Sequence, residues 1–576
     1  MLRSLLLCSA TPLLLTLAAA PIGLFPLAWI AFVPLLLQIG RAPSRRSALL
    51  IGWTAGALYF AANIWWLWTA SIPGTIVLIL YFGFYWGLGA LLLQATGWFR
   101  DGWANVDGSP LEHEANSVAR LLVGRSLLLA AGWVACEWLR CHVVSGFPWL
   151  PLGSTQTPLP LLCQVADLGG PWLISFWVML INAAVALAWN ERGHADARSL
   201  RRAAAATIVA ALGIVAAYGA YRLQTTVTTP GPRVMVLQSN FGHLRGGAPT
   251  APPEQVIAYF LEQLESQLAS QADEQRVDLV MLPESVLPPI NGEARTQLAP
   301  APVGPQLQQL HRQLQALAHR HQVALLVGGT AVTDWTTEGS ARIGREIRNS
   351  VYFYDATTKD DPARYDKTFL VPFSEQAPLA WAPPWLRHAG LLIAAARAVQ
   401  PMTPGALADL RAFPLSWTPP GESRGATTRI LTPICLEAIS PDSVRQLLRA
   451  ADRADGRVGL LATISNDGWF AAQEKHQHFQ LVILRCIENR LPLARCSNTG
   501  VSGFIDSAGR VVESSPINQT YTASARLDLD PRITVYSRIG DAFAFACIAL
   551  TATVASAGVV MRLCRRPSTA VARGRD

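Results

Sequence analysis

The chain has 576 residues, of which 51% are hydrophobic and only 15% are charged. Soluble domains carry about 25% charged residues, so the composition excludes a wholly soluble protein. A formal net charge of +8 would suit nucleic-acid binding, but the arginines cluster beside apolar runs, as membrane topology requires. We therefore expect no nucleic-acid partner. The nine cysteines show no CxxC spacing, which disfavours a zinc or redox site, and we predict no metal and no cofactor.

Eight apolar runs predict membrane-spanning helices, because a spanning helix needs about 20 apolar residues. Their approximate limits are 4–20, 22–39, 48–69, 72–96, 122–140, 171–190, 203–222 and 541–562. The first run could also be a signal peptide with a small-residue cleavage site at Ala18-Ala-Ala20. Pro21 and a second apolar run follow at once, which favours a tight membrane hairpin.

Basic residues predict the orientation of this bundle. Every second loop contains arginine, whereas the loops around Pro21 and Ser71-Ile-Pro-Gly74 contain no lysine or arginine. Basic loops lie in the cytoplasm by the positive-inside rule. We therefore expect a multi-pass protein of the bacterial cell (inner) membrane with both termini in the cytoplasm. The arginines are Arg41, Arg45, Arg46, Arg100, Arg120, Arg125, Arg192, Arg198, Arg201, Arg202, Arg562, Arg565 and Arg566.

The span limits divide the chain into four parts. We predict a membrane bundle of seven helices over 1–222, a catalytic domain over 223–540, an eighth membrane helix over 541–562 and a basic cytoplasmic tail over 563–576. The domain follows an odd number of crossings and is therefore extracytoplasmic, on the periplasmic side. ATP is scarce there, which favours a reaction that needs no nucleotide.

The segment 223–540 alternates apolar runs with amphipathic stretches, which predicts a layered α/β domain. Strands are expected at 234–238, 278–282, 323–328, 349–354, 429–434, 458–463 and 493–496, and helices at 254–271, 304–321, 440–452 and 475–490. The stretch 376–420 breaks this rhythm and is too long for an ordinary loop. We interpret it as a lid or arm that touches the membrane, with an ordered surface excursion as the alternative.

Three short segments of this domain carry a glutamate, a lysine and a cysteine, each beside an apolar β-like run. They are Met281-Leu-Pro-Glu284, Tyr365-Asp-Lys367 and Leu431-Thr-Pro-Ile-Cys435. A cysteine nucleophile needs a base or a nearby positive charge, because a free thiol is mostly protonated at neutral pH. We expect Cys435 to attack, Glu284 to move the proton, and Lys367 to stabilise the oxyanion with the backbone N–H after Cys435. This chemistry is acyl transfer through a thioester.

Several further residues are candidates for supporting or substrate-binding roles. Glu375 and Glu437 could orient Lys367 or Cys435 or hold an amine, or could form structural salt bridges. We expect Tyr365 to position Lys367. Trp469 could line an acyl pocket or pack in the core. His476 and His478 form an HxH pair that could bind a metal, but we expect no cluster of further ligands there, which favours substrate or structural contacts over a metal.

These segments together resemble the carbon–nitrogen hydrolase (nitrilase) superfamily, whose Glu-Lys-Cys triad they reproduce in order. With eight spans around the domain, the whole chain is similar to the apolipoprotein N-acyltransferase family. The resemblance implies transfer of a fatty acyl chain from a membrane phospholipid to the N-terminal cysteine amine of a diacylglyceryl apolipoprotein, which is the last step of lipoprotein maturation. It also implies a bilayer environment, and we expect a monomer.

Two positions depart from the family pattern. Leu436 stands where the family usually has an aromatic residue after the nucleophile, and Ser374 stands where it usually has glycine. We expect Leu436 to alter lipid fit or rate without loss of the chemistry. The main alternative function is a membrane-tethered amidase or nitrilase that hydrolyses a small amide. A non-enzymatic lipid-binding scaffold or transporter would predict a damaged triad, and all three residues are present.

Overall fold

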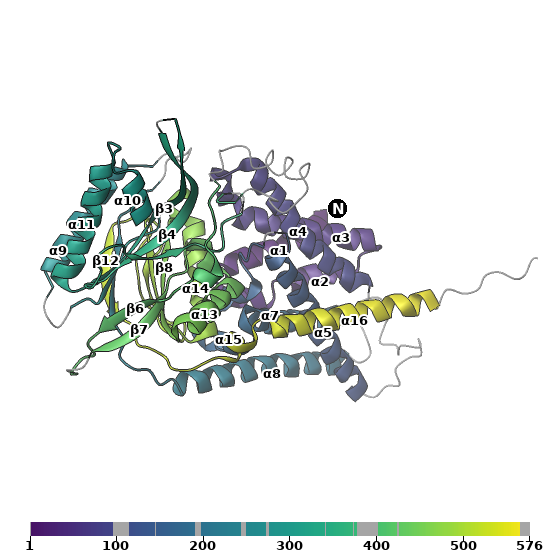
Figure 1. Ribbon diagram of the computed structural model, residues 1–576. Helices are drawn as coiled ribbons and strands as arrows, with labels where there is room; N and C mark the ends of the chain where they lie inside the picture. Colours follow the sequence, from purple (N-terminus) through teal and green to yellow (C-terminus); the bar gives the residue numbers. More distant parts are fainter. Residues whose placement is uncertain are drawn as a thin grey trace, which may run out of the picture.

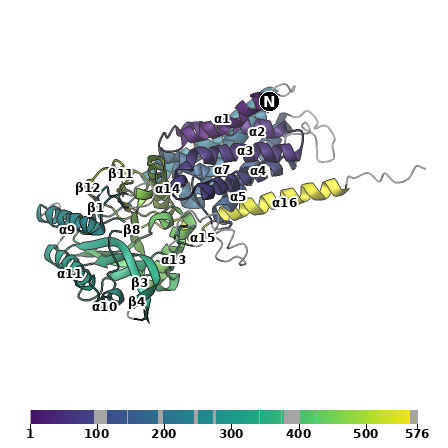
Figure 2. The same cartoon turned by 90° about the horizontal axis from the view of Figure 1, so that it is seen from above.

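The computed structural model describes residues 2–95, 115–144, 146–190, 197–242, 249–271, 276–339, 341–372, 374–376, 401–422 and 425–564. An α-helical bundle and an α/β domain lie side by side, and helix α14 (Ala472–Asn489) lies where they meet (Figures 1 and 2). The predicted lid at 376–420 lies largely outside the described residues. Its described end, from residue 401, carries strand β6 (Phe413–Trp417), which is hydrogen-bonded into a sheet of the α/β domain and is therefore not part of a lid.

The bundle is built from long apolar helices that come from both ends of the chain. Helix α16 returns to the bundle after the α/β domain and packs against α5 and α7. The longer helices are α1 (Leu2–Ala18), α3 (Arg45–Asn63), α4 (Ile72–Ala95), α5 (Ala115–His142), α7 (Ala166–Asn190), α8 (Ala197–Gln224) and α16 (Ala542–Cys564).

Four helices of the described residues are long and apolar enough to cross a membrane, at 72–94, 119–142, 166–190 and 197–224. They correspond to the fourth to seventh predicted spans. Three other predicted spans coincide with shorter apolar helices at 8–18, 25–40 and 542–557. The remaining one, 48–69, ends as a helix at Asn63 and continues as a 3-10 turn over Trp65–Thr69.

The predicted continuous span at 22–39 differs from the observed structure. It is divided into a 3-10 turn (Phe25–Trp29) and the short helix α2 (Val33–Gly40), each with proline in its first turn. Proline lacks the backbone N–H that a continuing helix requires. The side chain of Asn182 accepts from the N–H of Phe32 and donates to the carbonyl of Ala28, both at 2.8 Å. These bonds satisfy backbone groups at the break, which would otherwise be costly in an apolar bundle.

The α/β domain contains two six-stranded sheets that pack face to face. Their strand orders are β12-β1-β2-β3-β4-β5 and β11-β10-β9-β8-β7-β6. In each sheet the three central strands are parallel and the outer pairings are antiparallel. The strands are β1 (Arg233–Gln238), β2 (Leu279–Met281), β3 (Ala324–Glu338), β4 (Ala341–Tyr354), β5 (Ala363–Asp366), β7 (Ala426–Leu431), β8 (Val458–Ser465), β9 (Leu493–Ser497), β10 (Gly503–Ile505), β11 (Val511–Ser514) and β12 (Tyr521–Arg526).

Helices cover the outer faces of both sheets and complete a four-layer α–β–β–α domain (Figure 1). Helices α9 (Pro253–Ala269) and α11 (Gly304–His321) pack over the first sheet through one buried apolar cluster. Helices α13 (Pro441–Asp455) and α14 cover the second. The larger cluster fills the space between the sheets and continues into the bundle. The layered α/β architecture agrees with the prediction from the apolar runs.

One face of α14 joins the domain to the bundle. Gln473, Gln477 and Gln480 recur at the spacing of one helix face, and all three make hydrogen bonds to the bundle. Their partners are the indole of Trp65 (2.6 Å), the indoles of Trp66 and Trp149 (3.2 and 2.8 Å) and the N–H of Ala20 (3.2 Å). A second link is a buried ion pair between Arg490 and Asp167 at 2.6 Å. These contacts seat the domain firmly on the bundle.

Candidate active site

The three predicted reactive residues lie at or just beyond strand ends. Glu284 follows β2, Lys367 follows β5, and Cys435 begins a 3-10 turn (Cys435–Ile439) after β7. Strand ends are where functional groups gather in layered α/β folds. Gly328 on β3 permits the turn at Glu284, because a Cβ there would lie 2.3 Å from the carbonyl oxygen of Pro283. The structure thus brings together residues that are up to 151 positions apart in sequence.

Glu284 is held in a buried polar network with Lys367. The Lys367 Nζ lies 3.6 Å from Glu284 Oε1 and 2.9 Å from Glu375 Oε1. The side chain of Asn349 donates to both carboxylates, at 2.6 and 2.8 Å. The N–H of Asn466 donates to the other oxygen of Glu284 at 2.7 Å. Burial acts to lower the pKa of Lys367, but the charges of Glu375 and Glu284 outweigh it and raise the pKa. Lys367 is therefore a fixed cation.

Cys435 is half-buried and has a φ of 53°, in the left-handed region that residues with a Cβ seldom occupy. Such a conformation costs roughly 1–3 kcal/mol and is often found at active sites. Burial raises the pKa of its thiol well above the ordinary value, and the charge of Glu284 adds to this, whereas Lys367 opposes it. The resting thiol is therefore protonated, and a base must remove its proton during attack.

Glu437 ties the segment after Lys367 to the turn that carries Cys435. Its fully buried carboxylate accepts hydrogen bonds from the backbone N–H groups of Thr368, Phe369 and Ile434, at 2.7–2.8 Å. The hydroxyl of Tyr365 donates to both of its oxygens, at 2.9 and 3.0 Å. Burial raises the pKa of Glu437 to about 7. Tyr365 therefore contacts Glu437, whereas the sequence suggested that it positions Lys367.

The remaining predicted residues lie at the margin of this network. Glu375 accepts from Lys367 and from the N–H of Val371 at 2.8 Å. Leu436 is half-buried against the main apolar cluster, and Ser374 is exposed. Trp469 is 43% exposed and ends a 3-10 turn (Asp467–Trp469), so its side chain lies at the surface and not in the core.

Sequence reasoning missed several residues of the site. Asn349 and Asn466 hold Glu284, and the only available signal was a polar residue at each end of an apolar strand. We expected no cluster of further metal ligands around His478, and this was wrong, because Asp467 and Glu474 lie beside it. One ligand atom from each of the three lies within 4.8 Å of the others. Arg495 already pairs with Asp467 at 2.9 Å, so a metal would compete with a guanidinium.

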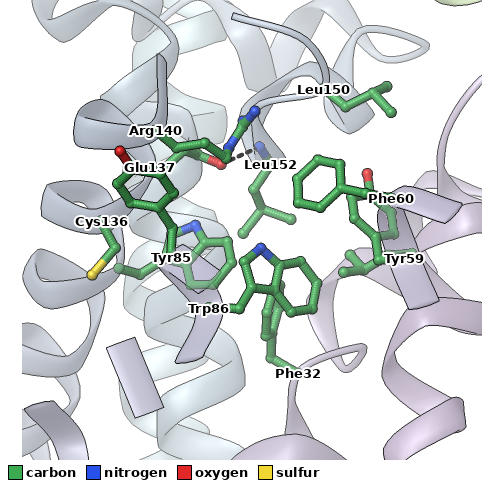
Figure 3. A pocket seen from close by; sticks show the side chains of 12 residues that line it. Phe32, Tyr59, Phe60, Tyr85, Trp86, Cys136, Glu137, Arg140, Leu150 and Leu152 are labelled. Atoms are coloured by element: carbon green, nitrogen blue, oxygen red, sulfur yellow. Dashed lines mark hydrogen bonds between the residues drawn. The ribbon is translucent and has the colours of Figure 1, made fainter. Parts of the chain in front are cut away.

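Two charged residues of the bundle, Glu137 and Arg140, line a small cavity and hold the loop that carries Trp149. Aromatic side chains surround Glu137 and Arg140 (Figure 3). Glu137 accepts from the N–H of Leu152 at 2.6 Å, and Arg140 donates to the carbonyl of Trp149 at 2.9 Å. The cavity volume is about 20 Å³, which is room for about one water and not for an acyl chain. The charged pair therefore serves to position the loop that carries Trp149.

Comparisons with known proteins agree with this two-part organisation. Residues 12–184 match the family described as the apolipoprotein N-acyltransferase N-terminal domain, and residues 252–534 match the carbon–nitrogen hydrolase family. A solved amidase of the nitrilase superfamily from Nesterenkonia is 16% identical, with a TM-score of 0.33 over 53% of this chain and 92% of its own.

Curated relatives match along nearly the whole chain. A Geobacter metallireducens protein named apolipoprotein N-acyltransferase is 28% identical over 96% of this chain and 95% of its own length. Proteins of the same name from Rhizobium meliloti and Bordetella bronchiseptica are 29% and 27% identical over 87% and 93% of this chain, and over 85% and 92% of their own lengths. The chain therefore belongs to the apolipoprotein N-acyltransferase family and is an acyltransferase of the carbon–nitrogen hydrolase superfamily.

Proposed function

We propose that this protein transfers a fatty acyl chain from a membrane phospholipid to the N-terminal cysteine amine of a diacylglyceryl apolipoprotein, through a thioester on Cys435. The observation that carries the proposal is the shared buried network of Glu284, Lys367 and the Cys435 turn beside an apolar bundle. Family membership supports the choice of donor and acceptor.

In the first half-reaction, Glu284 removes the proton of the Cys435 thiol as the sulfur attacks the ester carbonyl. Lys367 and the backbone N–H of Leu436 stabilise the oxyanion. When the carbon–oxygen bond breaks, Glu284 returns the proton to the leaving alcohol, and a lysophospholipid departs. The raised pKa of the thiol favours this concerted removal over a resting thiolate.

In the second half-reaction, the amine of the apolipoprotein attacks the thioester and Glu284 accepts its proton. The carbon–sulfur bond breaks, the amide forms, and the proton returns to the thiolate of Cys435. A thioester retains the reactivity of the ester it replaces, so no nucleotide is required. Glu375 and Glu437 keep Lys367 and the Cys435 turn in place throughout, through the contacts described above.

Water must be kept from the thioester, or the protein would hydrolyse phospholipids. Moving an acyl chain into water costs roughly 0.8 kcal/mol per CH₂ group, so the site must open toward the bilayer. We assign the exposed Trp469 to contact with lipid. The seating of α14 on the bundle supports this access from the membrane.

We also propose eight membrane crossings with the α/β domain on the periplasmic side of the inner membrane, in a monomer. Helix α8 enters the domain at its C-terminal end, and Arg198, Arg201 and Arg202 lie in its first two turns. A helix of 28 residues extends about 42 Å, so these cations lie a membrane thickness away from the domain. Alkaline phosphatase fused after residue 226 should be active, and the same enzyme fused at residue 195 should be inactive.

The decisive experiment is intact-protein mass spectrometry of purified protein with phospholipid, beside Cys435→Ala. We expect a fatty-acyl adduct in the wild type, discharged by a diacylglyceryl-cysteine peptide and absent in the variant. An unmodified wild type that instead hydrolyses small amides would refute the proposal and favour the tethered amidase.

A further inference from the structure

The backbone carbonyl of Cys435 has a side-chain partner from another element. Nε2 of His478, on α14, lies 3.4 Å from this oxygen. Because Cys435 adopts a left-handed conformation, its carbonyl points away from the direction that a regular helical turn would give it. A carbonyl removed from water needs a hydrogen-bond donor, and His478 on α14 supplies one to Cys435.

The other ring nitrogen of His478 faces two buried carboxylates. Nδ1 lies 3.2 Å from Asp467 Oδ1 and 3.2 Å from Glu474 Oε1. A carbonyl oxygen can only accept a hydrogen bond, so the contact with Cys435 requires a hydrogen on Nε2, while Nδ1 faces the carboxylates. The ring can then bridge Asp467 and the carbonyl of Cys435 in one fixed orientation.

Helix α14, which seats the domain on the bundle, also carries His478, on a face beside that of the three glutamines. Gln477, the preceding residue, accepts from the indole of Trp149 at 2.8 Å. The ring of Trp149 lies 5.7 Å from the imidazole, centroid to centroid, in an edge-to-face arrangement. His478 is 2% exposed, so it is enclosed between the bundle loop and the Cys435 turn. The bundle therefore limits the positions that the imidazole can take.

We propose that His478 is a positioning residue for the nucleophile: its Nε2–H holds the carbonyl of Cys435 and thereby sets the direction of the thiol. The inference deepens the proposed function, because it rests on Cys435 as the acylated residue. A displacement of about 1 Å can cost about 100-fold in rate. The competing role is neutralisation of Asp467 and Glu474, which needs only Nδ1.

Two variants separate these roles, since the amide nitrogen of glutamine reaches the place of Nε2 and that of asparagine reaches the place of Nδ1. We expect His478→Gln to form the acyl-enzyme within about threefold of the wild-type rate, and His478→Asn to form it about 10- to 100-fold more slowly, as for loss of a charged hydrogen bond. His319→Asn, an exposed histidine in the last turn of α11, serves as the matched control and should behave as wild type.

The readouts are the single-turnover rate of the acyl adduct, thermal unfolding and metal content of the purified protein. Equal rates for both variants, or a faster rate for His478→Asn, would overturn the inference. So would metal bound by the wild type and lost from both variants. If His478→Asn does not fold, a folded His478→Gln that is more than tenfold impaired overturns it alone. A wild type without any Cys435-dependent adduct would refute the proposed function instead, which keeps the two failures distinct.

Discussion

Replacement of Lys367 by methionine tests the electrostatic centre of the site. Methionine keeps the length of the apolar stem but removes the cation that lies 2.9 Å from Glu375 and 3.6 Å from Glu284. At an effective dielectric constant of about 20, these attractions are roughly 6 and 5 kcal/mol before the cost of burial is subtracted. Removing one partner of such a buried group costs about 3–5 kcal/mol of stability, or roughly 6–10 °C in unfolding temperature.

The loss of catalysis should exceed what reduced stability explains. An oxyanion donor is worth about 100- to 1000-fold in rate, and the proposed role of Lys367 predicts a loss of this size in acyl-enzyme formation. The assay is the rate of the acyl adduct at a temperature where both proteins are folded. The control is Lys367→Met combined with Glu375→Gln, which removes one of the uncompensated carboxylates and should restore much of the stability.

The double variant also provides the refuting result. We expect it to unfold near the wild-type temperature and to remain as slow as Lys367→Met in acylation. Recovery of acylation together with stability would mean that Lys367 only balances the charge of Glu375. An unchanged rate in the single variant would contradict its role at the oxyanion.

Three further outcomes follow from buried carboxylates. Glu437→Gln loses charge-assisted hydrogen bonds to the Cys435 turn, each worth about 1.5–3 kcal/mol. The rate of acyl-enzyme formation should therefore fall at least about tenfold. A wild-type rate would show that Glu437 does not hold the Cys435 turn in place. Burial raises the pKa of Glu474 from 4.5 to about 7. Between these two pH values the folded protein keeps the proton of Glu474, whereas the unfolded chain releases it. The free energy of unfolding should therefore fall by about 3 kcal/mol as the pH rises from 4.5 to 7. Glu474→Gln should remove that fall, seen as a larger gain in unfolding temperature at pH 8 than at pH 5. Asp167→Asn leaves Arg490 without its carboxylate and should lower the unfolding temperature by roughly 6–10 °C; no change would show that this ion pair does not secure the domain.

With the proposed role of His478, the contacts across α14 would let the bundle influence the position of Cys435 as well as anchor the domain. Trp149 approaches both Gln477 and His478, and its loop is fixed by Glu137 and Arg140. A tethered hydrolase would need no such fixed junction, because a single span suffices to hold a domain at a membrane. The junction therefore favours a site whose substrate is delivered from the bilayer.

Local sequence patterns determined the broad layout of this protein. Runs of about 20 apolar residues indicate membrane helices because each backbone polar group must be satisfied within the segment, and four of the predicted spans have helices of the required length and hydropathy. Apolar strands alternating with amphipathic helices indicated the layered domain for the same local reason. The three candidate reactive residues were predicted because each stands beside an apolar run.

Only the tertiary structure decided how these pieces meet. The backbone groups at the break in 22–39 are satisfied by Asn182, about 150 residues away, and the partners of Glu284 come from β4 and from the turn after β8. The approach of His478 to Cys435 depends on how α14 is seated on the bundle. Such contacts join residues far apart in sequence, and no periodicity or spacing records them, because they arise only when separate elements pack into one core.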